Sequence, residues 1–240
     1  MTKERLAEIQ NSVAEFYAEA EIPLPTATRC VSPLTELIGG CSLTCTEISE
    51  LSSRKALNFL LKRGGLTRLP QVLNDEPLAG FIYASRNFGS IFVEREDIIV
   101  RRRFSIAHEI GHYLLHFRPL LNSASNEGDW FLTESLDKTE GADTEDELSP
   151  KGQVSAGESD DLIRCLPPLE TMEREANCFA VELLMPEAVV RELAERQINN
   201  FLRDDDLVWR LATELLVSRA TMRFRLRELK LFPIEELRVN

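Results

Sequence analysis

Apolar residues along this chain recur with two different spacings, and these spacings predict where helices and strands lie. Over residues 3–20 and again over about 47–62 they fall three or four positions apart, which is the period of an amphipathic helix. Between these helices, residues 24–45 carry prolines and paired glycines without a period, so we expect an irregular segment. Two short apolar runs, 78–84 and 89–93, are typical of a β-hairpin. The pattern therefore predicts helices combined with a small sheet.

A further helix is apolar on nearly every side. Its apolar positions are Phe104, Ile106, Ala107, Ile110, Tyr113, Leu114 and Leu115. Because a surface helix has only one apolar stripe, we expect this helix to be buried in the core. All three histidines of the chain, His108, His112 and His116, lie on it. Buried imidazoles need polar partners to offset their desolvation, so we expect a polar site around these histidines.

The first two of these histidines bracket Glu109 in an H-E-x-x-H motif. Residues four apart share one helix face, so both imidazoles can bind one metal ion with Glu109 beside them. This arrangement is typical of zinc peptidases, and a buried structural histidine pair is the alternative. Gly111 favours the metal interpretation, because glycine inside a helix costs about 1 kcal/mol relative to alanine and needs a close-packing reason.

A third protein ligand is expected on a second helix, over residues 169–186. The apolar face of that helix places Glu173 inward, and Glu173 is the predicted third ligand. Asn177, one turn later, is expected to hold a ligand imidazole in its tautomer. Glu175 remains the rival ligand, although Glu175 and Glu182 are both expected nearer to solvent.

The two motif segments resemble a known family. The patterns R-R-F-S-x-A-H-E-x-G-H-Y-L-L-H and E-x-E-A-N-x-F-A-x-x-L-L-M-P are similar to those of the ImmA/IrrE zinc metallo-endopeptidases. The hairpin runs are similar to the strand pair that precedes the motif helix in that family. The resemblance covers roughly residues 46–186, less an insertion, and continues more weakly to Phe232.

The resemblance implies an α+β fold with a mostly helical, gluzincin-like core and a cytoplasmic bacterial or phage setting. It also implies a protein substrate, namely a helix-turn-helix transcriptional repressor. In this interpretation one Zn²⁺ per chain is bound by His108, His112 and Glu173. Glu109 is the catalytic base.

The sequence assigns the other parts of the site less closely, namely the oxyanion-stabilising residue, the role of His116 and the strand that binds substrate. The residue that stabilises the oxyanion stays open between Tyr83, Tyr17 and an arginine. His116 is expected to lie off the ligand face as a structural residue. The hairpin is the candidate for an edge strand that binds extended substrate, with a purely structural sheet as the alternative.

The patterns predict three parts: an N-terminal helix and irregular segment over 1–45, the metallopeptidase core over 46–186 and a helical C-terminal subdomain over 187–240. Within the core, residues 122–161 contain twelve acidic residues and two lysines, with almost no apolar period. Their composition predicts a disordered surface insertion. Gating of the cleft and repulsion of nucleic acid are the alternatives.

The net charge of −12 is concentrated in that insertion, and the rest of the chain is near neutral. No 18-residue apolar run is present, so no membrane partner is expected. Five cysteines without a framework are typical of a reducing cytoplasm. Cys41 and Cys45 lack further ligands for a metal site, and Cys178 is expected to pack in the core.

The C-terminal helices carry a basic face that is formed by Arg219, Arg223, Arg227 and Lys230. A helix, a short turn and a basic helix are typical of a DNA-binding helix-turn-helix. However, residues 187–240 contain ten acidic and ten basic residues, so the strong positive field of a DNA-binding domain is absent. We expect scaffolding or substrate docking. A metal-containing, DNA-binding transcriptional regulator is the alternative function.

Overall fold

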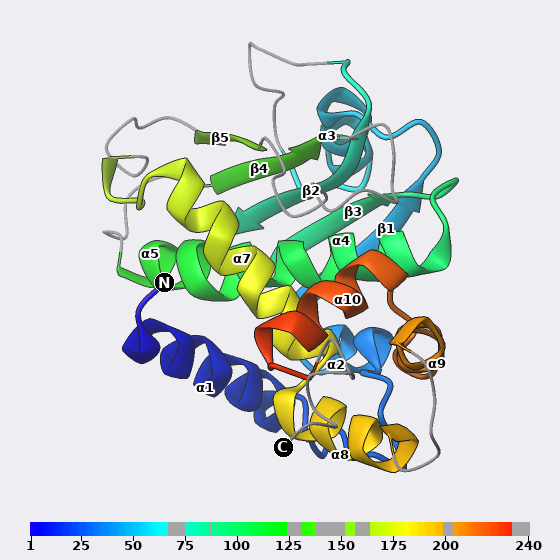
Figure 1. The fold of residues 1–240 in the computed structure, drawn as a ribbon. Helices are drawn as coiled ribbons and strands as arrows, with labels where there is room; N and C mark the ends of the chain where they lie inside the picture. Colours follow the sequence, from blue (N-terminus) through cyan, green and yellow to red (C-terminus); the bar gives the residue numbers. More distant parts are fainter. Residues whose placement is uncertain are drawn as a thin grey trace.

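The computed structural model describes residues 1–66, 75–86, 88–123, 131–137, 152–156, 164–198 and 204–231. The fold is α+β, as predicted, and combines a mixed sheet with helices on both of its faces (Figure 1). Three helices precede the motif helix in the chain: α1 (Lys3–Glu19), α2 (Leu34–Gly39) and α3 (Ser53–Lys62). The motif helix α4 (Ile99–His112) continues into a π-helical turn, η1 (Tyr113–Phe117), and then α5 (Arg118–Ser123). The remaining helices are α7 (Leu169–Leu184), α8 (Glu187–Ile198), α9 (Asp204–Leu215) and α10 (Arg219–Glu228).

The sheet contains five strands in the order β1-β3-β2-β4-β5. They are β1 (Leu43–Ile48), β2 (Leu78–Ser85), β3 (Gly89–Glu94), β4 (Phe131–Asp137) and β5 (Gly152–Ala156). β1 pairs with β3 in parallel, and the other three pairings are antiparallel. The predicted hairpin is confirmed as the β2–β3 pair, in which Phe81 lies opposite Phe92.

Alternation along β2 assigns its two faces to two different packing partners. Phe81 and Tyr83 belong to an apolar cluster with Leu57 and other residues of α3. Ile82 and Ala84 belong to the main core together with Ile110 of α4. Because successive side chains of a strand point to opposite faces, α3 covers one face of the sheet and α4 the other.

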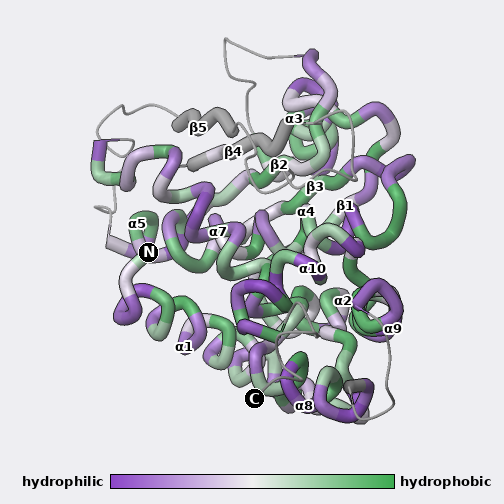
Figure 2. Tube along the Cα trace, viewed as in Figure 1, coloured by the Kyte–Doolittle hydropathy of each residue, from purple (hydrophilic) through white to green (hydrophobic). Residues whose placement is uncertain are grey.

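The motif helix α4 lies between the sheet and α7, as the ribbon shows (Figure 1). α1 packs against α7 with Ile9, Val13 and Phe16 turned into the core, and its alternating hydropathy is visible in Figure 2. Residues of α8, α9 and α10 belong to the same apolar core as α1 and α7. The division at residue 187 therefore stays a prediction, since no separate core marks it among the described residues.

Side-chain caps explain where several helices begin. Thr2 accepts a hydrogen bond from the backbone N–H of Arg5 at the start of α1. Ser52 and Ser218 cap α3 and α10 in the same way, through the N–H groups of Lys55 and Thr221. Such caps satisfy backbone donors that have no partner within the helix.

Three expectations were wrong in detail. The second helix was predicted from residue 47, but residues 43–48 form β1 and the helix begins at Ser53. The insertion was predicted to be disordered, but β4 and β5 lie within it, and the rest of residues 124–163 lies outside the described residues. The hairpin was the candidate edge, but β2 and β3 are both interior strands, and the edges of the described sheet are β1 and β5.

Candidate metal centre

Three potential ligands meet between α4 and α7. The Nε2 atoms of His108 and His112 lie 2.9 Å apart. The carboxylate of Glu173 faces both, with Oε2 3.5 Å from His108 Nε2 and Oε1 3.3 Å from His112 Nε2. The ligand atoms of all three residues lie within 4.8 Å of one another. The structure thus brings together the three residues that the sequence predicted as ligands.

This cluster fits a cation better than it fits a set of polar side chains alone. His108 and His112 are fully buried, and Glu173 is 6% exposed. Both Glu173 oxygens are buried, and neither forms a hydrogen bond of good geometry within the described residues. Buried carboxylate oxygens normally have hydrogen-bond partners, and a bound ion is one of the recognised reasons for an exception. Two imidazole nitrogens and one carboxylate are a typical ligand set for zinc in peptidases.

Electrostatics favour the metal-binding form of two of the three groups, Glu173 and His112. Burial raises the pKa of Glu173, but its contacts with His108 and His112 outweigh this and lower the pKa to about 2. Burial lowers the pKa of His112 to about 3. Burial also acts to lower the pKa of His108, but its contacts with Glu173 outweigh burial, and the pKa of His108 is raised. At neutral pH the site therefore holds an ionised carboxylate and a neutral His112, which are the ligand forms that a metal requires.

Asn177 adjoins this cluster on α7, one turn after Glu173. Its Oδ1 lies 3.0 Å from Nδ1 of His108, and both side chains are buried. The amide oxygen accepts a hydrogen bond from Nδ1, which leaves Nε2 directed at His112 and Glu173. The predicted role of Asn177 is compatible with this position.

Glu109 is fully buried on α4 and lies directly beneath β2. A Cβ atom at Gly80 would lie only 2.4 Å from Glu109 Oε1. Any side chain at this strand position would therefore displace the carboxylate. Gly80 was not singled out from the sequence, although glycine inside an apolar strand often indicates a close approach of the backbone.

Gly111 provides a second close approach, between the two ligand helices. A Cβ atom there would lie 3.0 Å from Ala176 Cα and 3.1 Å from Phe179 Cβ. The packing reason expected for this glycine is thus the contact of α4 with α7. It brings the backbone of α4 close enough to α7 for Glu173 to face the histidines.

Glu175 and Glu182 of α7 are both buried, and the expectation that they point to solvent was wrong. Glu175 is 7% exposed and interacts with Arg5 of α1 and His116 of η1. Glu182 is 5% exposed and forms an ion pair with Arg225, which is itself 1% exposed. All three partners are distant in sequence from α7, so the pattern on α7 alone gave no sign of them.

The remaining candidates lie elsewhere. Tyr83 packs on the sheet face that α3 covers, opposite α4, and Tyr17 is buried beside Ser32, so the structure brings neither to the metal ligands.

Four basic residues of the tail, Arg219, Arg223, Arg227 and Lys230, lie on or just after α10. Arg219, Arg227 and Lys230 are exposed, whereas Arg223 is only partly exposed and pairs with Asp205 of α9.

Comparison with known families places this site in context. Residues 66–139 and 156–227 match the peptidase M78 family, which is described as the IrrE N-terminal-like domain. The two segments cover more than half of the chain and include α4 and α7. The chain belongs to this family. The resemblance seen in the motifs is thereby confirmed, and the chain is a member of a peptidase family with a possible His-His-Glu metal site.

The peptidase M78 match leaves out α1, α2, β1 and α3, which precede it, and residues 140–155, which include most of β5. Curated protein sequences give no significant match to the chain. No helix of the described residues has the length and hydropathy needed to cross a bilayer.

Proposed function

We propose that this protein is a zinc-dependent endopeptidase of the cytoplasm that cleaves a helix-turn-helix transcriptional repressor. The observation that carries the proposal is the convergence of His108, His112 and Glu173, with Glu109 beside them, in a member of a peptidase family. A peptidase family implies a protein substrate. The repressor as that substrate rests on the ImmA/IrrE resemblance.

The proposed chemistry assigns one role to each group of the site. His108, His112 and Glu173 would hold the metal, which supplies a Lewis acid that polarises the scissile carbonyl. Glu109 lies next to the ligands on the same helix, where its carboxylate can take a proton from the attacking water and transfer it to the leaving nitrogen. Asn177 keeps the Nε2 lone pair of His108 directed at the ligand cluster.

A second candidate function is a metal-containing regulator that binds DNA through its C-terminal helices. The exposed side chains of Arg219, Arg227 and Lys230 on and after α10 favour it. The same face suits docking of an acidic or amphipathic protein substrate. Salt-dependent DNA binding by the full chain, lost when these three residues are replaced by alanine, would favour the regulator over the peptidase.

Co-expression tests the main proposal. The chain is expressed with the helix-turn-helix regulator encoded nearest to its gene, and truncation of that regulator is followed by immunoblot and mass spectrometry. Glu109→Gln serves as the control, because it removes the base while preserving the side-chain shape. We expect truncation with the native chain and at least about 100-fold less with Glu109→Gln. Equal truncation by both chains would contradict the role of Glu109 as base.

A further inference from the structure

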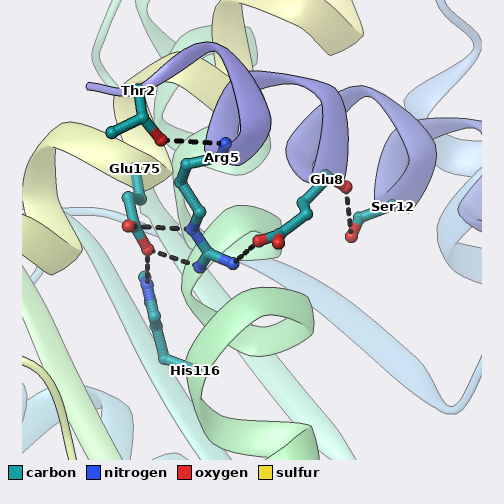
Figure 3. A network of polar contacts seen from close by, with 6 residues as sticks. All are labelled: Thr2, Arg5, Glu8, Ser12, His116 and Glu175. Carbon is teal, nitrogen blue, oxygen red and sulfur yellow. Dashed lines mark hydrogen bonds and ion pairs between the residues drawn. The ribbon is translucent and has the colours of Figure 1, made fainter.

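A polar network outside the metal cluster joins three helices. Arg5 of α1 donates two hydrogen bonds to the carboxylate of Glu175, from Nε to Oε1 at 2.9 Å and from Nη2 to Oε2 at 2.6 Å (Figure 3). Nε2 of His116 lies 3.1 Å from the same Oε2. The remaining guanidinium nitrogen, Nη1, pairs with Glu8 at 2.7 Å. Glu175 therefore connects α1, α7 and η1 at one point.

This network lies next to the metal ligands in the chain. Glu175 follows Glu173 by two residues on α7, and His116 follows His112 by four residues. The rings of His112 and His116 have centroids 5.5 Å apart. A π-helical turn holds more residues than an α-helical turn, so η1 rotates less per residue and keeps His116 nearer to the ligand face than an α-helix would. The same two helices are thus connected twice, by the ligand cluster and by the His116–Glu175 contact.

We propose that Arg5, Glu175 and His116 form a positioning network that holds the two ligand-bearing helices at the separation that the metal requires. The inference rests on the metal site proposed above. A site that is already arranged before the metal binds loses less conformational freedom on binding, and its affinity is higher for that reason. The His116–Glu175 contact needs no metal, so it can hold the helices in place before the ion arrives.

The same contacts decide which glutamate can serve as a ligand. Both oxygens of Glu175 are already used by Arg5 and His116, whereas those of Glu173 face the two ligand imidazoles. Arg5 also compensates the charge of a carboxylate that is only 7% exposed. Glu175 is therefore kept from competing with Glu173, although both lie within one turn of α7.

Arg5 lies outside the segments that match the family. The matched segments begin at residue 66 and contain His116 and Glu175, but not α1. Since α1 packs along α7 and its first turn carries Arg5, the N-terminal helix is expected to affect metal affinity from outside the matched domain.

Zinc affinity of the full-length protein tests the proposal. Arg5→Met removes the charge and the hydrogen bonds but keeps an unbranched apolar side chain in place of the aliphatic part of arginine, and His116→Leu removes the other end of the network. His116→Gln is the rescue variant, because its amide can donate to Glu175 in place of Nε2. Arg118→Met is the matched control: Arg118 pairs with Glu19 of α1 at 2.7 Å, and its side chain is 33% exposed, as is that of Arg5.

Two measurements are made for each protein: the zinc dissociation constant, by competition with a chromophoric chelator, and the visible spectrum of the cobalt-substituted form. We expect Arg5→Met and His116→Leu to weaken zinc binding by about 10- to 100-fold and to shift the cobalt bands. His116→Gln and Arg118→Met should stay within about threefold of the native chain. If His116→Leu fails to fold, the proposal is tested by Arg5→Met, which changes the partly exposed end of the network.

The outcomes separate this inference from the proposed function. Zinc binding and cobalt bands that do not change in Arg5→Met, or that change equally in Arg118→Met, would overturn the positioning role. If His108→Ala bound zinc as tightly as the native chain, the proposed metal site itself would be wrong.

Discussion

The amide oxygen of Asn177 lies 3.0 Å from Nδ1 of His108 and sets the direction in which that imidazole presents its other nitrogen. An amide oxygen can only accept a hydrogen bond, so Nδ1 carries a proton, and in the neutral imidazole the lone pair is then on Nε2. Nε2 faces His112 and Glu173 across the buried cluster. One residue of α7 thereby orients His108 of α4, while Glu173 of the same helix faces His108 across the cluster.

Replacing Asn177 by leucine is expected to weaken zinc binding by about 10- to 100-fold, because His108 then loses the partner that fixes its tautomer and ring orientation. Asn177→Asp should bind more tightly than the leucine variant, since a carboxylate accepts from Nδ1 in the same place. Chelator competition gives both constants. An affinity of Asn177→Leu equal to that of the native chain would show that the contact has no part in metal binding.

Removal of Glu173 tests the assignment of the third ligand. Glu173→Ala should lose most of the bound zinc, because two imidazoles alone do not neutralise the ion and leave a ligand position empty. Metal content of the purified protein is measured by atomic emission, with Glu170→Ala, an exposed change on the same helix, as control. Full zinc stoichiometry in Glu173→Ala would move the assignment to Glu175 or another residue.

Gly80→Ala is expected to abolish most of the peptidase activity while zinc binding and stability persist. The added methyl group would meet the end of the Glu109 side chain, at 2.4 Å from Oε1, and that flexible carboxylate can move away. The base is then displaced, although the ligands are untouched. Cleavage assays, zinc titration and thermal unfolding are compared, and activity equal to that of the native chain would contradict the predicted position of Glu109.

Gly111→Ala is expected to act differently, because the added methyl group meets backbone instead of a side-chain end. Ala176 Cα would lie 3.0 Å from the new Cβ, so α4 and α7 must separate. We expect a loss of about 1 to 3 kcal/mol in the free energy of unfolding from overpacking, partly offset by about 1 kcal/mol of helix propensity. Zinc affinity should fall together with stability. Urea unfolding of the zinc-free protein measures the first effect, and a midpoint higher than that of the native protein would contradict this packing.

Thiol reactivity tests the environment of α7. Burial, with Glu182 and Glu228 nearby, raises the pKa of Cys178 to about 12, whereas Cys165 is exposed. Since the thiolate is the reactive form, iodoacetamide at pH 8 should modify Cys165 at least about tenfold faster than Cys178. Between pH 8 and pH 10 the rate at Cys178 should rise about tenfold for each pH unit, because its thiolate fraction does. Peptide mapping by mass spectrometry follows each site, and faster modification of Cys178 would contradict its burial.

Sequence alone predicted the local part of the site. Helical period places His108 and His112 on one face with Glu109 beside them, and this relation needs no information about the rest of the fold. The apolar face of the second helix placed Glu173 inward for the same reason. The β2–β3 hairpin was also predictable, because its strands are adjacent in the chain and its pairing depends on a short turn.

Only the tertiary structure decided the relations between distant segments. β1 was missed because its partner β3 lies more than forty residues further along and only one of its side chains is fully buried. The hairpin lies in the interior of the sheet because β1 pairs with β3 on one side and β4, from the acidic insertion, pairs with β2 on the other. Strand order is a property of pairing in space, and residue pattern within a strand does not encode it.

The burial of Glu175 and Glu182 was decided in the same way. Each was predicted to be solvated, since a carboxylate avoids the core unless a partner compensates its charge. The partners are Arg5, some 170 residues earlier in the chain, and Arg225, some forty residues later. Local sequence determined which residues can bind a metal, because helix geometry is local. Packing of α1, α7 and α10 decided which glutamate faces it, because compensation of a buried charge depends on residues that only the folded chain brings together.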